Sequence, residues 1–292
     1  MQLSEDARRI KNDIKEKIMA EVSTFPSMPR AGVKLRALLN EKDVQIAQIE
    51  QILRHDPGLT TNVLRLANSA YFGVPAKVGS LKQAIMLVGI KRFAQIAVSA
   101  SMSKTMDKTV EGYGLRPGEL WLHSIAASNT AEALTKNKKF AETNDVFTPA
   151  LLHDMGKLVL GKFAKEEFQK IESIVAKGVP LVRAENMVFG TDHAEVGAQI
   201  LTKWSFPDDI VNAVRWHHNA ERIKDSNMQS AIVYLSNIMC QSNGDGNSTG
   251  GQYAMPAAVV LKRLGIKIDQ YEVLAGQAHS WMNKLSDTLS FE

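Results

Sequence analysis

Cysteine is nearly absent from this sequence of 292 residues, in which Cys240 is the only one. A single cysteine excludes a disulfide within the chain and is typical of proteins from a reducing compartment. No apolar run approaches the roughly 18 residues that suggest a membrane-spanning helix. Residues 1–6 also lack the basic start and the apolar stretch of a secretory signal peptide. We therefore expect a soluble, cytoplasmic protein with no membrane partner.

The net charge is small as well, at +4. Residues 1–110 hold 17 Lys or Arg against 10 Asp or Glu, whereas residues 111–292 hold 18 against 21. A basic half can bind polyanions. These charges, however, are spread along several expected helices, as on ordinary solvated faces. The distribution argues against nucleic acid as the main partner.

Apolar residues recur at helical spacing along most of the chain, and no segment alternates as a strand does. Asp56 and Ser80 are placed to cap helices, and Gly89 to end one. We predict an all-α fold, with helices over 30–40, 44–55, from 57 to an end near 68–73, over 81–88 and 90–103, within a block over 118–240, and over 256–264 and 269–288. An amphipathic helix is expected over 3–22.

The chain divides into four expected regions: an amphipathic helix over 1–23, a helical block over 24–110, a second helical block over 111–242, and a flexible loop with C-terminal helices over 243–292. The first helix either packs on the body or serves as a partner-binding arm, and it offers one place for a dimer contact. The segment 243–251 is rich in Gly and Asn. It lacks the regular acidic positions and the final glutamate of a calcium loop, so we expect a surface loop.

Five of the seven histidines lie between positions 123 and 218, and one of them, His153, precedes an aspartate inside an expected apolar helix. Imidazole and carboxylate groups together suit a divalent transition metal. A His-Asp pair is costly to bury unless a metal or mutual hydrogen bonds satisfy it. Spacing alone leaves a metal site and a set of hydrogen-bonded core histidines equally open. The candidate residues are His123, His153, Asp154, His193, His217 and His218.

The segment around the pair, His153-Asp154-Met155-Gly156-Lys157, resembles the signature of the HD superfamily of metal-dependent phosphohydrolases. The order His, His-Asp, His, His-His also resembles the HD-GYP branch, whose members hydrolyse cyclic di-GMP with two or three bound metals. This resemblance covers about residues 118–240 and implies a helical bundle of the HD type.

The first block resembles a more specific relative, the HDOD domain. HDOD modules are HD-related helical domains of bacterial signalling and regulatory proteins, generally without demonstrated enzymatic activity. The resemblance implies an HD-type bundle with an additional N-terminal helical subdomain, over about 22–240. The motifs that carry it are Phe25-Pro26-Ser27-Met28-Pro29, Asp56-Pro57-Gly58-Leu59, Leu66-Ala67-Asn68-Ser69-Ala70-Tyr71-Phe72-Gly73 and Ala84-Ile85-Met86-Leu87-Val88-Gly89.

The resemblance also implies roles for single residues. Asp154 would bridge two metals, and Lys157 matches the lysine that contacts the substrate phosphate in active relatives. If the chain is active, these two would be its catalytic residues. The implied ligands are His123, His153, Asp154, His193, His217 and His218, with Asn237 at the place of the last one.

Two positions depart from the family pattern. HD enzymes need a late aspartate where this chain has Asn237, and an amide brings no negative charge to a dication. HD-GYP proteins have a glutamate where this chain has Asn219, and their Asp-Gly and Gly-Tyr-Pro elements are missing here. Both departures weaken the expected charge balance and substrate binding of a metal-assisted hydrolase.

We therefore expect a bacterial signal-transduction module of the HDOD type, non-catalytic and acting through protein contacts, with a residual HD-type metal site. The alternative is a metal-dependent phosphohydrolase acting on a nucleotide or cyclic dinucleotide. One or two ions of Fe, Mn, Ni or Zn suit the donor set. The expected partners are signalling proteins, with a nucleotide second messenger and a second copy of the chain as further candidates.

Overall fold

The computed structural model describes residues 5–39, 41, 43–69, 77–135, 145–223, 227–241 and 256–288. Within these ranges the chain forms helices joined by short loops, and its only bridge of the extended type pairs Val110 with Leu115. The prediction of an all-α fold is therefore confirmed. The predicted loop over 243–251 lies outside the described residues. No helix in the described ranges has both the length and the apolar character needed to cross a bilayer.

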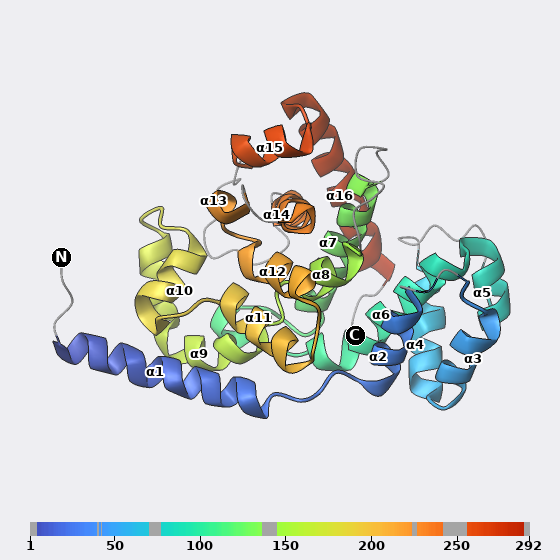
Figure 1. Ribbon diagram of the computed structural model, residues 1–292, viewed down its shortest axis with the longest axis horizontal. Coiled ribbons are helices and arrows are strands. Elements are labelled where there is room, and N and C mark those ends of the chain that lie inside the picture. The colour runs from blue at the N-terminus through green and yellow to red at the C-terminus, as the bar shows by residue number, and fades with distance from the viewer. Residues whose placement is uncertain are drawn as a thin grey trace.

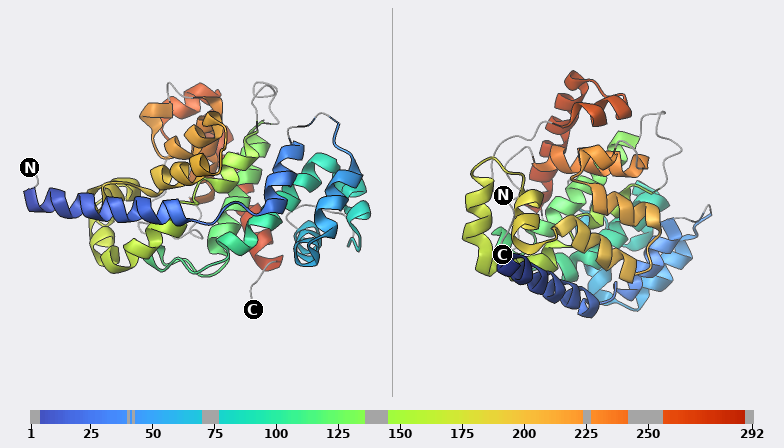
Figure 2. Two further views of the ribbon diagram at one scale, coloured as in Figure 1. Left: turned by 60° about the horizontal axis from the view of Figure 1, so that its bottom comes forward. Right: turned by 60° about the vertical axis from the view of Figure 1, so that its left-hand side comes forward.

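The first half of the chain folds into six helices, of which α1 lies apart from the other five. Helix α1 runs beside α9, α10 and α11, away from the group formed by α2–α6 (Figures 1 and 2). The bounds are α1 Glu5–Thr24, α2 Arg30–Leu39, α3 Ile46–Arg54, α4 Pro57–Ala67, α5 Leu81–Val88 and α6 Ile90–Met106.

The apolar stripe of α1 packs on the body over only part of the helix. Ile18 and Val22 are buried and Ile14 is half-buried, whereas Ile10 is 60% exposed. Lys203 holds the end of this helix, because its Nζ donates to the carbonyl oxygens of Val22 and Phe25. The helix thus packs on the body through its C-terminal half and leaves its N-terminal half exposed.

The second half builds a bundle in which α7 and α14 lie against each other, with α8 and α12 packed beside them. Helices α15 and α16 pack against this bundle, α15 on α14 and α16 on both α7 and α14 (Figure 1). The bounds are a 3-10 helix η1 Glu111–Tyr113, then α7 Glu119–Thr135, α8 Phe147–Leu152, α9 Lys157–Val175, α10 Leu181–Phe189, α11 His193–Lys203, α12 Asp208–Trp216, α13 Ala220–Ile223, α14 Met228–Gln241, α15 Ala258–Leu264 and α16 Ile268–Thr288.

Local capping explains several of these boundaries. The Asp56 side chain accepts a hydrogen bond from the Leu59 amide at 2.9 Å, so the α4 N-terminus is satisfied. Ser80 accepts from Gln83 at 3.2 Å in the same way at α5. Gly89 has a φ of 81°, which a residue with a side chain rarely adopts, and it ends α5 immediately before α6 begins. The predicted caps and stop are confirmed.

Asn68 fixes the end of α4 by a pair of hydrogen bonds. Its Oδ1 accepts from the Val78 amide at 2.7 Å, and its Nδ2 donates to the Val78 carbonyl at 2.9 Å. Ser69 donates to the Leu66 carbonyl within the same turn at 2.7 Å. Both side chains therefore serve the structure internally.

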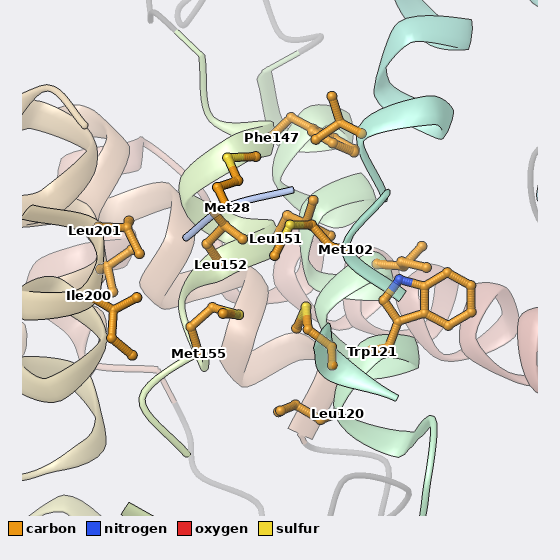
Figure 3. Packing of buried hydrophobic residues seen from close by; sticks show 14 of the residues in the cluster. Met28, Met102, Leu120, Trp121, Phe147, Leu151, Leu152, Met155, Ile200 and Leu201 are labelled. Atoms are coloured by element: carbon orange, nitrogen blue, oxygen red, sulfur yellow. The ribbon is translucent and has the colours of Figure 1, made fainter. Parts of the chain in front are cut away.

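One hydrophobic core crosses from the first half to the second. Met102 on α6 lies near Leu151 and Phe147 on α8, and Trp121 on α7 packs in the same cluster (Figure 3). The Trp121 indole also donates to the Ser99 carbonyl at 2.9 Å, which ties α7 to α6. A second cluster joins α7 and α14 to α15 and α16. The division of the chain into four regions stays a prediction.

The structure corrects the placement of the His-Asp pair, which the sequence suggested to lie inside a helix. Helix α8 ends at Leu152 and α9 begins at Lys157, so His153 and Asp154 lie in the turn between them. Gly156 lets this turn approach α11 closely, because a Cβ atom there would lie 1.9 Å from the His193 carbonyl oxygen. The turn thus packs directly on the backbone of α11.

Candidate metal centre

Five separate segments deliver the candidate residues to one buried place in the second half. His123 comes from α7, Asn237 from α14 and His193 from the first turn of α11. The His-Asp pair comes from the α8–α9 turn, and Lys157 is the first residue of α9. His217 and His218 follow the end of α12. The structure therefore brings together all the predicted site residues: His123, His153, Asp154, Lys157, His193, His217, His218 and Asn237. Their roles as ligands stay predictions.

Asp154 lies at the centre, and its Oδ2 faces one group of side chains. The Lys157 Nζ donates to this oxygen at 2.7 Å. The Nε2 atoms of His153 and His123 lie 3.4 Å and 3.6 Å from it. Asn237 belongs to the same group, since its Oδ1 is 3.1 Å from the His123 Nε2. The amide thus stands where a late aspartate was expected.

The other carboxylate oxygen of Asp154, Oδ1, faces a second group. The Nε2 atoms of His193 and His217 lie 3.4 Å and 3.7 Å from it. His218 completes the group, with its Nε2 3.0 Å from the His193 Nε2. Asp154 therefore stands between two sets of imidazoles, one on each oxygen.

Backbone carbonyls orient two of the imidazoles. The His153 Nδ1 lies 2.7 Å from the Ala150 carbonyl oxygen, and the His217 Nδ1 lies 2.6 Å from the Val214 carbonyl oxygen. Each Nδ1 must carry the proton in order to donate there, so each Nε2 keeps its lone pair and points toward Asp154. Such outer contacts are typical of metal-ligating histidines.

His193 is oriented by a carboxylate that the sequence analysis missed. Both oxygens of Glu185 on α10 lie near its Nδ1, at 2.9 Å and 2.8 Å, and Glu185 also accepts from the His193 amide at 2.9 Å. Tyr113 in turn donates to Glu185 at 2.7 Å. A signal was present, because Glu185 shares the apolar face of its helix with Leu181, Ala184 and Val188.

Burial and charge set the protonation states of the centre. Burial lowers the pKa of His123 to about 3 and that of His217 to about 4. Burial alone would raise the pKa of Asp154, but its interactions with the His153 imidazole and the Lys157 ammonium outweigh burial and hold this pKa well below its usual value. At neutral pH His123 and His217 are therefore neutral and Asp154 is charged, which are the forms that bind metal.

His193 follows a different balance. Burial lowers its pKa, but the charge of Glu185 and the hydrogen bond to it outweigh burial, so the pKa is raised above 6.5. Burial and the same carboxylate raise the pKa of Tyr113 well above 10. Tyr113 therefore remains a hydrogen-bond donor to Glu185 at any physiological pH.

The donor set fits a divalent transition metal. His153, Asp154, His193 and His217 are fully buried, yet within the described residues the Asp154 Oδ1 and the His217 Nε2 have no hydrogen-bond partner. Buried polar atoms are normally paired, so two unpaired ones that face each other fit a bound ion. The donor atoms form two groups whose members lie within 4.8 Å of one another, and both groups include Asp154.

Asn219, the second departure from the family pattern, lies outside the centre. Its side chain is exposed, and its Oδ1 accepts a hydrogen bond from the Arg222 amide at 3.0 Å. This contact caps the short helix α13. The position therefore serves local structure in this chain.

A family model described as the HDOD domain matches residues 25–220, which is more than half of the chain. This chain belongs to the HDOD domain family. A protein from Treponema pallidum (strain Nichols) without an assigned function is 25% identical over 204 residues, which cover 69% of this chain and 39% of that protein. The chain thus spans about two fifths of the length of this relative.

Solved structures share the HDOD fold over nearly the whole chain. An HDOD domain protein of unknown function from Geobacter sulfurreducens superposes with a TM-score of 0.77 at 21% identity, covering 96% of this chain and 98% of that one. A protein from Shewanella amazonensis, provisionally named a phosphohydrolase, gives 0.72 at 21% identity over 93% and 97%. One from Marinobacter aquaeolei, provisionally named a signal transduction protein, gives 0.75 at 16% identity over 98% and 66%.

Proposed function

We propose that this HDOD protein is a non-catalytic signalling module that acts through protein contacts and keeps a metal centre of the HD type. His123, His153, Asp154, His193, His217 and His218 would hold the ion or ions, with Asn237 as a weak additional ligand. A divalent ion bound there would act as a Lewis acid and would lower the pKa of a bound water.

The single observation that carries the non-catalytic part is Asn237 in the centre. Its Oδ1 lies 3.1 Å from the His123 Nε2, at the place where the resemblance to HD enzymes implies a carboxylate. An amide oxygen adds no negative charge, so the charge of a dication there is compensated less completely. Loss of a charged ligand from a hydrolytic metal site typically reduces both occupancy and turnover.

The environment of Lys157 supports the same proposal. In active relatives the matching lysine contacts the substrate phosphate, whereas here its Nζ lies 2.7 Å from the Asp154 Oδ2 and the side chain is buried. An ammonium group engaged by a buried carboxylate is less available to an incoming phosphate. The same contact stabilises the charge of Asp154.

Protein contacts are the proposed route of signalling because large apolar side chains are exposed away from the metal centre. Met86 and Leu87 on α5 are 72% and 44% exposed and adjacent in sequence. Exposed apolar side chains of this size can anchor a partner. The partners would be signalling proteins or a second copy of this chain.

An activity assay tests the non-catalytic part. The purified protein is incubated with bis(p-nitrophenyl) phosphate, and separately with cyclic di-GMP, in added Mn²⁺ or Fe²⁺. We expect no turnover above that of the Asp154→Ala variant. Metal-dependent turnover that disappears in His153→Ala and Asp154→Ala contradicts the proposal.

The alternative is a metal-dependent phosphohydrolase for a nucleotide or cyclic dinucleotide. The convergence of five histidines on Asp154 favours it, since a protein without catalysis does not need two complete groups of donors. In that case Asp154 would hold the ions and Lys157 would bind the substrate phosphate. The names of the structural neighbours are divided between signalling and hydrolysis, so the shared fold does not choose between the two.

A further inference from the structure

We propose that the metal centre is asymmetric and holds its tight ion on the α11–α12 side. We define the α11–α12 position as the Asp154 Oδ1 with His193, His217 and His218, and the α7–α14 position as the Asp154 Oδ2 with His123, His153 and Asn237. The inference rests on the metal-binding part of the proposed function and goes beyond it by ranking the two positions.

The shared carboxylate already distinguishes the positions. The Asp154 Oδ2 accepts a hydrogen bond from the Lys157 ammonium at 2.7 Å, whereas its Oδ1 has no hydrogen-bond partner within the described residues. A cation in the α7–α14 position would share its oxygen with a positive charge and be repelled by it. A cation in the α11–α12 position would bind the unpaired oxygen instead.

The remaining donors favour the same side. The α11–α12 position offers three imidazoles, one of which, His217, has an unpaired Nε2. The α7–α14 position offers two imidazoles and an amide, and the His123 Nε2 already lies at hydrogen-bond distance from the Asn237 Oδ1. Imidazole is a better ligand than a neutral amide oxygen for the transition metals that suit this centre.

The residues behind the ligands add a third difference. On the α11–α12 side, Glu185 places a carboxylate 2.8 Å from the His193 Nδ1, and Tyr113 holds that carboxylate by a hydrogen bond of 2.7 Å. On the α7–α14 side, the His123 Nδ1 is buried without a hydrogen-bond partner among the described residues. A carboxylate behind a histidine fixes its orientation and raises its basicity, so His193 is a better-prepared ligand than His123.

Co²⁺ binding to the chelator-stripped protein tests the ranking. Bound metal is measured by equilibrium dialysis with elemental analysis, and coordination by visible absorption. We expect two classes of Co²⁺ site, the first with an affinity at least about tenfold higher than the second. This ratio is the smallest effect typical of a carboxylate that hydrogen-bonds to a ligating histidine. His218→Ala, at the half-buried rim, should remove the tight class, whereas His123→Ala should leave it within about threefold of wild type.

Variants expected to raise the affinity of the weaker Co²⁺ site give a second test, because a misfolded variant would not gain affinity. Asn237→Asp adds a charged ligand and Lys157→Met removes the competing ammonium, so each should tighten the second ion by about tenfold. Asn12→Asp, an exposed residue of α1, makes the same charge change as the first variant and should alter neither class. Far-UV circular dichroism verifies the fold of each variant.

Two results would overturn the ranking while leaving the non-catalytic proposal intact: loss of the tight class in His123→Ala, or two classes of equal affinity that neither Asn237→Asp nor Lys157→Met changes. Absence of bound Co²⁺ in the wild type would contradict both the ranking and the metal-binding part of the proposed function. A third result would support the ranking and contradict only the non-catalytic part. In it, His218→Ala loses the one tight ion, and the wild-type protein hydrolyses a phosphodiester.

Discussion

The carboxylate of Glu185 contacts the Nδ1 of His193, so it sets the orientation and basicity of that imidazole as a metal ligand. Replacing it with glutamine keeps the size of the side chain but removes the charge that faces the His193 Nδ1 at 2.8 Å. We expect Glu185→Gln to weaken the first Co²⁺ by about 10- to 100-fold in equilibrium dialysis, the range found for outer-shell partners. The matched control is Glu172→Gln on the exposed face of α9, which should bind as wild type does. Equal loss in both variants would remove the assigned role.

Cys240 is buried on α14, and its thiol provides a test of the packing there. Burial raises the pKa of the thiol to about 12, although the nearby Thr130 hydroxyl opposes the shift. Since the thiolate is the reactive form, the native protein at pH 8 should react with a disulfide reagent such as Ellman's reagent only slowly. Unfolding in guanidinium should expose one reactive thiol per chain. Rapid labelling of the native protein would contradict the burial of α14.

Which site residues could be predicted from the sequence depends on their residue type. Histidines and a His-Asp pair are rare enough in an apolar run that the sequence alone singled out six site residues. Glu185 gave only the weaker signal of a glutamate on the apolar face of its helix, because a charged helical residue is usually solvated. Its burial depends on the start of α11, which packs against it only in the folded chain.

At the scale of elements, the α8–α9 turn holds the His-Asp pair through Gly156. A Cβ at this position would lie 1.9 Å from the His193 carbonyl oxygen and 2.6 Å from the Gly197 amide nitrogen, both of which are backbone atoms. Gly156→Ala should therefore lower the free energy of unfolding by about 3 kcal/mol or more, at the upper end of overpacking effects. Urea denaturation measures this change.

Gly276 on α16 offers the matched control, because nothing lies within 4 Å of a Cβ placed there. Gly276→Ala should leave stability unchanged or raise it by up to about 1 kcal/mol, as expected for alanine in a helix. If both variants unfold at the same urea concentration, the close contact between the turn and α11 is wrong.

The end of α4 depends on Asn68, which pairs with both polar backbone groups of Val78. Asn68→Ala would leave these groups without their partners, at a cost of about 1–3 kcal/mol. Thermal unfolding measures the change, and Asn12→Ala on the exposed face of α1 is the control. A melting temperature equal to that of the control would show that the two bonds do not stabilise this segment.

The boundaries of α4 and α5 could be predicted because they depend on local residues, namely Asp56, Ser80 and Gly89. The break between α8 and α9 could not, because apolar residues continue on both sides of it. The turn at this break packs through Gly156 on the backbone of His193 and Gly197 in α11, which is distant in sequence. Local patterns cannot report a contact of that kind.

At the scale of the whole molecule, the sequence did not show how the parts are joined. Helix α1 precedes α2–α6 in sequence but packs on α9, α10 and α11 (Figure 1). One core also continues from α6 into α7 and α8. These contacts link the metal centre to the N-terminal helices, because α7, α8 and α11 all carry or border its ligands. Loop lengths alone left this arrangement undetermined.

The central claim is that Asp154 and the histidines around it form one centre that holds a divalent ion. The most direct test measures Co²⁺ bound per chain by equilibrium dialysis, for the wild-type protein and for Asp154→Ala, with circular dichroism to verify that both are folded. We predict at least one bound ion per wild-type chain and none in the variant. No bound ion in the wild type, or equal binding by the folded variant, would contradict the claim.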